Sequence, residues 1–231
     1  MSGKSAPNIL QKLFSLLKQY IDKYTVRNVI YFSLTLILFM AGVIAYGVIL
    51  NIREATLSEA MLGKGFTQLN DPNIIIDRDT YALNLYEDTV FVKSYRVSLG
   101  RNAHKVKNRA GDEATPVGEY IICEIDTLHQ YDIFFRLNYP NLDDAAEALR
   151  KGWISQKEFN QIKFEFFYED CTKYNEALGG DIGIHGIGRL NYIFKNLPFV
   201  FNWTNGSIAM SNENMNELYS IIKVGTKVVI K

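Results

Sequence analysis

The chain has 231 residues, and its 25 basic and 25 acidic residues give a formal net charge of zero. A nucleic-acid partner would require a basic surplus or a basic stripe, so this balance argues against one. With 48% hydrophobic and 13% aromatic residues, the chain can bury a sizeable core, and its length suits one domain with an appendage.

The appendage is the segment from Val29 to Leu50, which runs for 22 residues without a charge. About 20 apolar residues cross a bilayer as a helix, and no obvious A-x-A cleavage site follows, so the segment is predicted to be an uncleaved signal anchor. The alternative is a buried core helix, although such helices rarely run this long without a charged interruption.

The charges on either side of this segment predict its orientation. Five basic residues and one acid, Asp22, precede it, whereas basic and acidic residues balance in the stretch that follows. The positive-inside rule therefore places residues 1–28 in the cytoplasm and everything after Asn51 outside. We expect a single-pass protein of the inner (cytoplasmic) membrane, held there by residues 29–50, with a periplasmic C-terminal part.

Upstream of the anchor, apolar residues recur at helical spacing from Ile9 to Tyr24, with lysines on the other face. This pattern predicts an amphipathic helix. Two uses of the helix stay open, since it could lie on the inner membrane surface or contact another subunit.

Beyond the anchor, residues 51–72 are predicted to form a short, partly helical connector that ends in the polar turn QLNDPN. The pattern then changes to short strands. In NIIIDRDTYALNLYEDTVFVKSYRVSLG, β-forming and polar residues alternate, which predicts two or three antiparallel strands joined by tight turns. The segments TPVGEYIICEI and YDIFFRLNYP each add a strand.

Helices follow in the middle of this region. Asn141 can cap LDDAAEALRKG, and Ser155 to Glu158 form a capping box that opens a second helix. A glycine-rich strand, LGGDIGIHGIG, an aromatic stretch, one more helix and the strand TKVVI complete the order. Residues 73–231 are therefore predicted to form a mainly β (α+β) domain, a barrel or sandwich with inserted helices.

The two cysteines, Cys123 and Cys171, lie 48 residues apart. An extracytoplasmic location permits a disulfide between them, but isolated thiols at this spacing are more often unpaired, and we expect these to be unpaired. Neither falls in a turn beside a histidine, so both are expected to be structural. The chain has no C-x-x-C motif and its three histidines are scattered, so no metal site and no cofactor are predicted.

Two segments could build a nucleophilic site. GIHGIG places His185 at the end of a strand, among glycines that let a substrate backbone approach closely. TNGSIAM places Ser207 on a turn, where the backbone N–H groups of Gly206 and Ser207 could face a developing oxyanion. A histidine and a serine within reach of one another form a base and nucleophile pair, although this spacing also occurs by chance in many chains.

A more specific signal comes from six motifs in one order: YRVSLGRN, GDEATPVGEYII, LNYPNLDDA, ALGGDIGIHG, NWTNGSIAMSNENMNELY and GTKVVI. Over roughly residues 73–231, this order resembles the L,D-transpeptidase catalytic domain, or YkuD-like, family. The likeness is closest to the branch whose nucleophile motif reads T-N/D-G-C-I-A. Asn205 and Ala209 are ordinary for that branch, and Ser207 is not.

The resemblance implies an activity and a set of site residues. In the family, a cysteine at the position of Ser207 attacks a peptide bond in the stem of peptidoglycan and forms a thioester. By this resemblance His185 is the general base, Gly186 belongs to its motif, and Gly206 with residue 207 supplies oxyanion donors. The implied partners are peptidoglycan stem peptides, and the implied process is bacterial cell-wall biogenesis and cell shape. The residues placed near the substrate are Thr204, Asn205 and Tyr139.

Serine in place of cysteine changes the chemistry of the site. A thiol has a pKa of about 8.5 that falls beside a histidine, whereas a serine hydroxyl must give its proton to a well-oriented base during attack. Loss of a nucleophile lowers rates by a factor on the order of 10⁴ to 10⁶. Three interpretations of Ser207 stay open: an introduced Cys-to-Ser change in a competent enzyme, a natural loss that leaves a catalytically inactive binding module, or a serine that works with His185.

Two other segments each have two interpretations. The aromatic stretch at residues 190–203 could pack in the core, or it could form a lid or a surface for a membrane or protein partner. Full burial of its phenylalanines would exclude a partner surface. The basic residues of KVKNRAGDEATPVG could form a solvated loop, which is the default, or hold acidic groups of the wall peptide; they are Lys105, Lys107 and Arg109.

Overall fold

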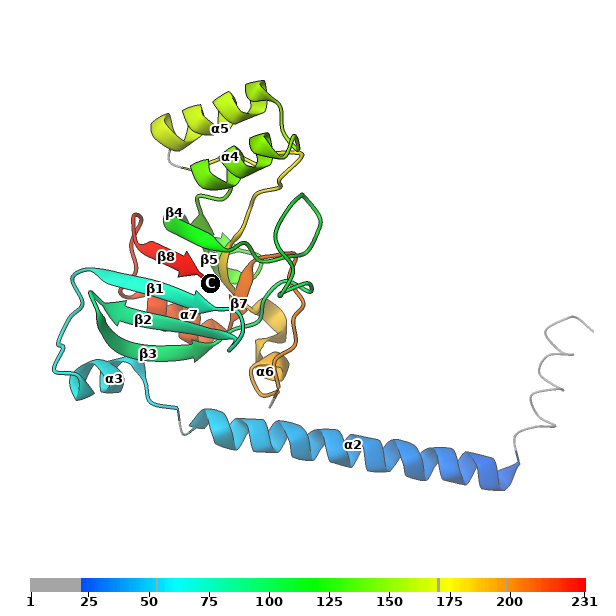
Figure 1. The fold of residues 1–231 in the computed structure, drawn as a ribbon. Helices are drawn as coiled ribbons and strands as arrows, with labels where there is room; N and C mark the ends of the chain where they lie inside the picture. The colour runs from blue at the N-terminus through cyan, green and yellow to red at the C-terminus, as the bar shows by residue number, and fades with distance from the viewer. Residues whose placement is uncertain (1–21, 53, 170, 198) are drawn as a thin grey trace, which may run out of the picture.

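The computed structural model describes residues 22–52, 54–169, 171–197 and 199–231. The first described element is the long helix α2 (Lys23–Ile52), which extends past the predicted apolar run at both ends and projects from the folded domain (Figure 1). Within its stretch Lys23–Leu50, an 18-residue window has a mean hydropathy of 2.3, and the stretch is long and apolar enough to cross a membrane. The amphipathic helix expected from Ile9 to Tyr24 lies almost entirely outside the described residues.

The domain is built on one mixed sheet of eight strands in the order β3-β2-β1-β8-β4-β5-β6-β7. The two ends of this order meet, because Ser98, just after β3, pairs with Ala209 of β7 through two backbone hydrogen bonds of 2.7 and 2.8 Å. The sheet thus closes on itself and confirms the mainly β architecture with inserted helices. The strands are β1 (Pro72–Asp77), β2 (Ala82–Glu87), β3 (Val90–Arg96), β4 (Gly118–His129), β5 (Asp132–Leu137), β6 (Gly183–Gly186), β7 (Ile208–Met210) and β8 (Lys227–Ile230).

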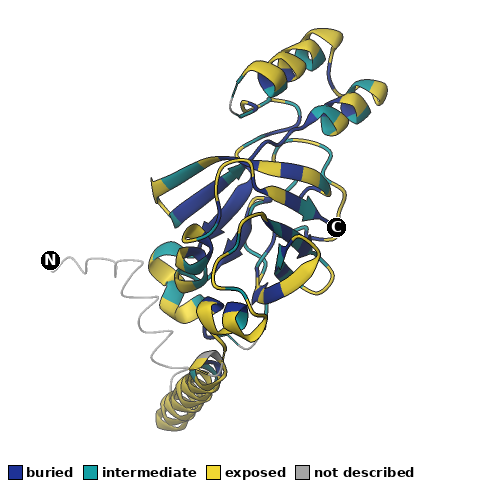
Figure 2. Ribbon diagram, turned by 90° about the vertical axis from the view of Figure 1, so that its left-hand side faces the viewer, coloured by how far each residue is buried: buried dark blue, intermediate teal, exposed yellow. Residues whose placement is uncertain are grey.

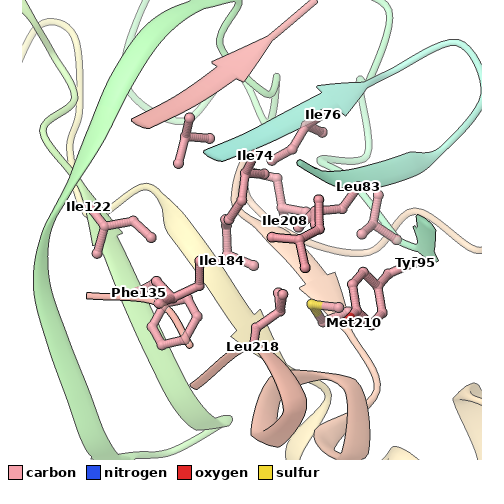
Figure 3. Packing of buried hydrophobic residues seen from close by; sticks show 14 of the residues in the cluster. Ile74, Ile76, Leu83, Tyr95, Ile122, Phe135, Ile184, Ile208, Met210 and Leu218 are labelled. Carbon is pink, nitrogen blue, oxygen red and sulfur yellow. The ribbon is translucent and has the colours of Figure 1, made fainter. Parts of the chain in front are cut away.

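The core lies inside this curved sheet, where Figure 2 shows many buried residues on the strands, and strand alternation explains which residues are buried. Ile74 and Ile76 of β1 are fully buried, as are Leu83 and Leu85 of β2, because every second side chain of a strand points to the same face. Figure 3 shows apolar side chains from most of the sheet converging there, together with Leu218 of α7 (Asn212–Tyr219). Each fully buried aliphatic side chain of this kind contributes about 1.5–3 kcal/mol to folding.

The remaining helices cover or extend the sheet. Both predicted helix caps are present, since Asn141 accepts from the N–H of Asp144 and Ser155 accepts from that of Glu158, and each forms a capping box. Figure 1 shows the two helices that they begin as a hairpin set to one side of the sheet, with its own small core. The helices are α3 (Leu57–Gly63), α4 (Leu142–Arg150), α5 (Gln156–Tyr168), the 3₁₀ turn η1 (Gly188–Leu190) and α6 (Asn191–Phe194).

Cys123 and Cys171 form a disulfide, so the expectation of unpaired thiols was wrong. Cys123 lies on β4, and Cys171 lies in the segment that leaves α5. The fold brings their Cα atoms to 5.3 Å, a proximity that a sequence separation of 48 residues does not reveal. The bond ties the end of the helical hairpin back to the sheet.

Replacing both cysteines with serine should lower the free energy of unfolding by about 2–4 kcal/mol, because the bond restricts the unfolded chain over a long loop. Urea unfolding of the full chain in detergent micelles, monitored by circular dichroism, measures the difference. The Ser98→Ala variant serves as a control without a change in crosslinking. Free thiols in the oxidised wild-type chain would contradict the assignment.

Candidate active site

The parallel pair β6–β7 brings the two predicted chemical groups to one face of the sheet. Ile184 is paired with Ile208 and His185 with Ala209. Both isoleucines are fully buried in the core, so the alternate positions point to the opposite face. His185 and Ser207, which comes two residues before Ala209, therefore lie diagonally across the pair, and both line the same pocket.

His185 is enclosed by aromatic rings. Tyr131 stacks on it with ring centroids 4.9 Å apart and Phe134 with centroids 6.0 Å apart, while Trp203 meets it edge-on at 5.7 Å. These rings leave His185 only 3% exposed. Burial lowers the pKa of His185 to about 4, so the imidazole is neutral at neutral pH.

The backbone next to His185 fixes its tautomer. Nδ1 lies 2.6 Å from the carbonyl oxygen of Gly186, and a carbonyl only accepts, so Nδ1 carries the proton and Nε2 keeps a free lone pair. Position 186 has room only for glycine, because a Cβ there would lie 2.6 Å from the carbonyl oxygen of Tyr131 and 2.8 Å from Oδ1 of Asn212. The motif GIHG thus holds a neutral imidazole at the end of a strand through contacts of adjacent residues.

The turn before β7 is held by the buried side chain of Thr204. Its Oγ1 accepts from the N–H of Gly206 at 3.2 Å and donates to the carbonyl oxygen of Ser207 at 2.5 Å. Gly206 has φ +124°, and a Cβ there would lie 2.7 Å from the carbonyl oxygen of Ala114. Thr204, predicted to lie near the substrate, also lines the pocket that holds His185 and Ser207. The N–H of Gly206, predicted to be an oxyanion donor, is bound to the Thr204 hydroxyl in this turn.

The hydroxyl of Ser207 is bound to backbone rather than to His185. It accepts from the N–H of Gly183 at 3.2 Å and donates to the carbonyl oxygen of Asp181 at 3.3 Å. No hydrogen bond between the two described side chains of Ser207 and His185 is present. Attack by this oxygen therefore requires that its hydroxyl first turn away from Asp181.

The pocket around these groups has a volume of about 750 Å³ and a rim of mixed charge. Arg136 pairs with Glu124 at 2.8 Å and also with Asp181, and Arg101 pairs with Glu113. The predicted site residue Asn205 stands on this rim, where its Oδ1 accepts from Arg101 at 3.2 Å. The rim thus offers both cations and carboxylates to a ligand.

Not every predicted residue reaches this pocket. Tyr139 is 3% exposed, donates to the carbonyl oxygen of Leu178 at 3.2 Å and lines a different pocket, next to α4. Of the three basic loop residues, Lys105 and Arg109 are exposed, whereas Lys107 lines the pocket with its ammonium 2.6 Å from Asp112. Lys107 thus holds its own loop together, so the interpretation of these residues as a solvated loop fits Lys105 and Arg109 but not Lys107.

Sequence reasoning missed the aromatic enclosure and the rim arginines; these residues are Tyr131, Phe134, Trp203, Arg101 and Arg136. They come from three separate segments, around residues 101, 131–136 and 203, and no sequence motif links the three. The one available signal was strand alternation in β5, which puts Phe134 and Arg136 on the same face two residues apart. Within the described ranges, no group of three or more His, Cys, Asp or Glu side chains is placed to hold a metal ion.

Comparisons with known proteins agree with this architecture. A family model described as YkuD, the L,D-transpeptidase catalytic domain, matches residues 71–230. No curated protein matches the chain.

Three solved structures show the range of likeness. Bd1075 from Bdellovibrio bacteriovorus is 19% identical with a TM-score of 0.43, over 71% of this chain and 48% of that one. An L,D-transpeptidase from Mycobacterium smegmatis is 10% identical with a TM-score of 0.41, over 70% and 58%. The helical cell shape determining protein Pgp2 from Campylobacter jejuni is 19% identical with a TM-score of 0.45, over 70% and 48%. The chain thus spans about half the length of these proteins.

The buried imidazole predicts a pH dependence of stability. An unfolded histidine has a pKa of about 6.5, so below that pH the unfolded chain takes up a proton that folded His185, with its pKa lowered to about 4, does not. Stability contributed by the neutral form is therefore lost as pH falls from about 6.5 to about 4, by up to about 3 kcal/mol.

The measurement compares the free energy of unfolding in urea at pH 7.5 and pH 4.5. The wild-type chain should lose about 2–3 kcal/mol more than His185→Gln over this interval. His104→Gln is the matched control, since that side chain is 61% exposed, and it should behave as wild type. Equal acid sensitivity in His185→Gln and wild type would show that His185 is not buried in its neutral form.

Proposed function

We propose that this chain, which belongs to the L,D-transpeptidase catalytic domain family, binds peptidoglycan stem peptides in the pocket lined by His185 and Ser207 and carries out acyl transfer at position 207. The observation that supports this most directly is the placement of both side chains on one face of the β6–β7 pair. Fold membership gives the class of reaction, and the site must supply the chemistry.

The pocket suits a peptide that carries charges of both signs. A stem peptide presents carboxylates and, on its diamino acid, a free amine. Arg101 and Arg136 can bind the carboxylates, while Glu113 and Asp181 on the same rim can bind the amine. The scissile bond would then lie between this rim and the enclosed imidazole.

The proposed base is Nε2 of His185. Its lone pair is free because Nδ1 donates to Gly186, and its pKa keeps it neutral at the working pH. In the acylation step, the Ser207 oxygen forms a bond to the carbonyl carbon of the substrate as its proton passes to Nε2. The carbon–nitrogen bond then breaks, and the proton goes to the leaving amine. A second amine or a water molecule resolves the ester in the same manner.

We assign the N–H of Ser207 as the oxyanion donor. The N–H of Gly206 is used by Thr204, which removes it from that role in this arrangement of the turn. A tetrahedral oxyanion would draw its stabilisation from the remaining backbone donor and from any donor that the substrate itself brings.

A second candidate function is stem-peptide binding without acyl transfer. One observation favours it: the Ser207 hydroxyl donates to the Asp181 carbonyl and has no hydrogen bond to His185. A cysteine at this position would need no such reorientation to ionise, because a thiolate forms near neutral pH. The two candidates share the pocket and differ only in what position 207 does.

The helix α2 would anchor the domain on the extracytoplasmic side of the inner membrane. The basic excess before it supports this orientation. The disulfide between Cys123 and Cys171 supports it independently, because such bonds persist in oxidising compartments. In this orientation the pocket faces the space that holds the cell wall.

Restoring sulfur at position 207 tests the acyl-transfer site. Ser207→Cys should form a covalent adduct with tetrapeptide stems or a carbapenem, seen as a gain in intact-protein mass, while Ser207→Cys with His185→Gln should form it at least about 100-fold more slowly because the base is lost. An adduct on wild-type Ser207 would show that the serine itself works. Binding of stem peptide by wild type with no adduct on Ser207→Cys would leave the binding function in its place.

The topology has its own test in spheroplasts. A cysteine introduced at Leu128, which is 94% exposed, should react with a membrane-impermeant maleimide in intact spheroplasts. A cysteine introduced at Ser5 should react only after the membrane is permeabilised. The reverse pattern would contradict the orientation of α2.

A further inference from the structure

Five large apolar side chains stand exposed on one segment next to the candidate site. They are exposed by 48–67%, and we call them the aromatic patch: Leu190, Tyr192, Ile193, Phe199 and Phe201. Soluble surfaces rarely gather so many large apolar side chains in one short segment without a partner. Core packing, one of the two interpretations of this stretch, therefore does not describe Phe199 and Phe201.

The patch is held on a fixed scaffold. The guanidinium of Arg96 on β3 donates to the carbonyl oxygens of Leu197 at 2.7 Å and Lys195 at 2.8 Å. Asn191 donates to Glu213 at 2.8 Å and accepts from the backbone N–H of Asn212 at 2.9 Å. These bonds tie both ends of α6 to the domain, so the exposed side chains stand on an ordered segment rather than on a loose loop.

The same segment contacts the helix proposed to span the membrane. Gly47 of α2 is buried, and a Cβ there would lie 1.7 Å from the carbonyl oxygen of Asn196. Figure 1 shows α6 beside the C-terminal part of α2. Gly47 stands three residues before Leu50, the last residue of the apolar run, which corresponds to about 4.5 Å along a helix. Asn196 therefore lies at the depth of the bilayer boundary.

We propose that the aromatic patch inserts into the outer interface of the same bilayer that α2 crosses, and so fixes the domain on the membrane surface. Aromatic residues concentrate at the headgroup level of membranes, where an apolar ring and a polar tip are both satisfied. A segment packed against a membrane-spanning helix at this depth has lipid as its neighbour. This inference rests on the proposed membrane span and needs no acyl transfer.

The patch is also joined to the candidate site. The ring of Phe194 lies 6.0 Å from that of Phe201 and 6.2 Å from that of Trp203, which in turn contacts His185. Trp203 and Tyr131 separate the pocket of Ser207 from a second pocket of about 690 Å³, which Leu190 and Phe194 line. Membrane insertion would therefore hold the site at a fixed height above the bilayer.

Fluorescence quenching in single-copy nanodiscs tests the proposal with the full chain. Both native cysteines are in the disulfide, so one introduced cysteine carries one environment-sensitive label. The test position is Phe199→Cys. The matched control is Phe167→Cys on α5, since Phe167 and Phe199 are 58% and 56% exposed, and Tyr46→Cys on α2 reports the membrane span.

Lipids with a nitroxide near the headgroup should quench the label at 199 by about two-fold or more, because interfacial side chains lie within about 5–10 Å of the headgroup boundary. The label at 167 should stay unquenched. In the Phe199→Cys background, Tyr192→Ser with Ile193→Ser should reduce the quenching, and circular dichroism verifies that each variant is folded. Phe201→Cys replaces Phe199→Cys if the latter does not fold.

Each other outcome overturns the proposal in a distinguishable way. Quenching at 46 without quenching at 199 would keep the span and remove the patch from the bilayer, which would leave a protein partner for it. Equal quenching of the labels at 199 and 167 would show that the domain touches the bilayer without a preference for the aromatic patch. An unquenched label at 46 would remove the span and this inference together, while the adduct test at position 207 would be unaffected.

Discussion

The parallel pairing of β6 with β7 is the constraint on which the site depends. The buried isoleucines Ile184 and Ile208 set its register. A shift by one residue would turn their side chains toward solvent and bring the side chain of His185 into the core. The same register puts the histidine and residue 207 on one face. Burial of the isoleucines thus positions two polar side chains, His185 and Ser207, that make almost no contribution to the core itself. The two close-packed glycines, Gly186 and Gly206, let neighbouring backbone approach from either end of the pair.

Around this pair, the domain balances an apolar wall against a charged rim. The rings of Tyr131, Phe134 and Trp203 exclude water from the imidazole and keep it neutral, whereas the rim keeps its arginines paired with carboxylates. If His185 acts as the proposed base, a neutral imidazole close to a charged rim suits a reaction in which a proton moves and the ligand arrives charged. The hydroxyl of Ser207 does not fit this arrangement, since its hydrogen-bond partners are backbone groups and not His185.

Local patterns in the sequence predicted much of the fold, because strand alternation and capping boxes depend on neighbours within a few residues. The three strands after residue 72 and the helix starts at Asn141 and Ser155 are of this kind. The disulfide, the aromatic enclosure and the burial of Tyr139 depend on contacts between distant segments, which no local period reports. The turn at Thr204 shows a subtler limit. Its motif was evident in the sequence, but which N–H its hydroxyl would use depends on the geometry of four consecutive residues.

The position of β8 in the sheet has a consequence for how the chain reaches its folded state. β8 lies between β1 and β4, parallel to the first and antiparallel to the second, so it joins two parts of the sheet that do not otherwise pair at that point. In the sequence, β1 lies near the start of the domain and β8 near its end. As the chain is synthesised from its N-terminus, the edge of β1 that pairs with β8 therefore stays open until the segment around Val228 is available. An open strand edge favours aggregation, so the period in which the folding domain is vulnerable lasts until that one strand inserts.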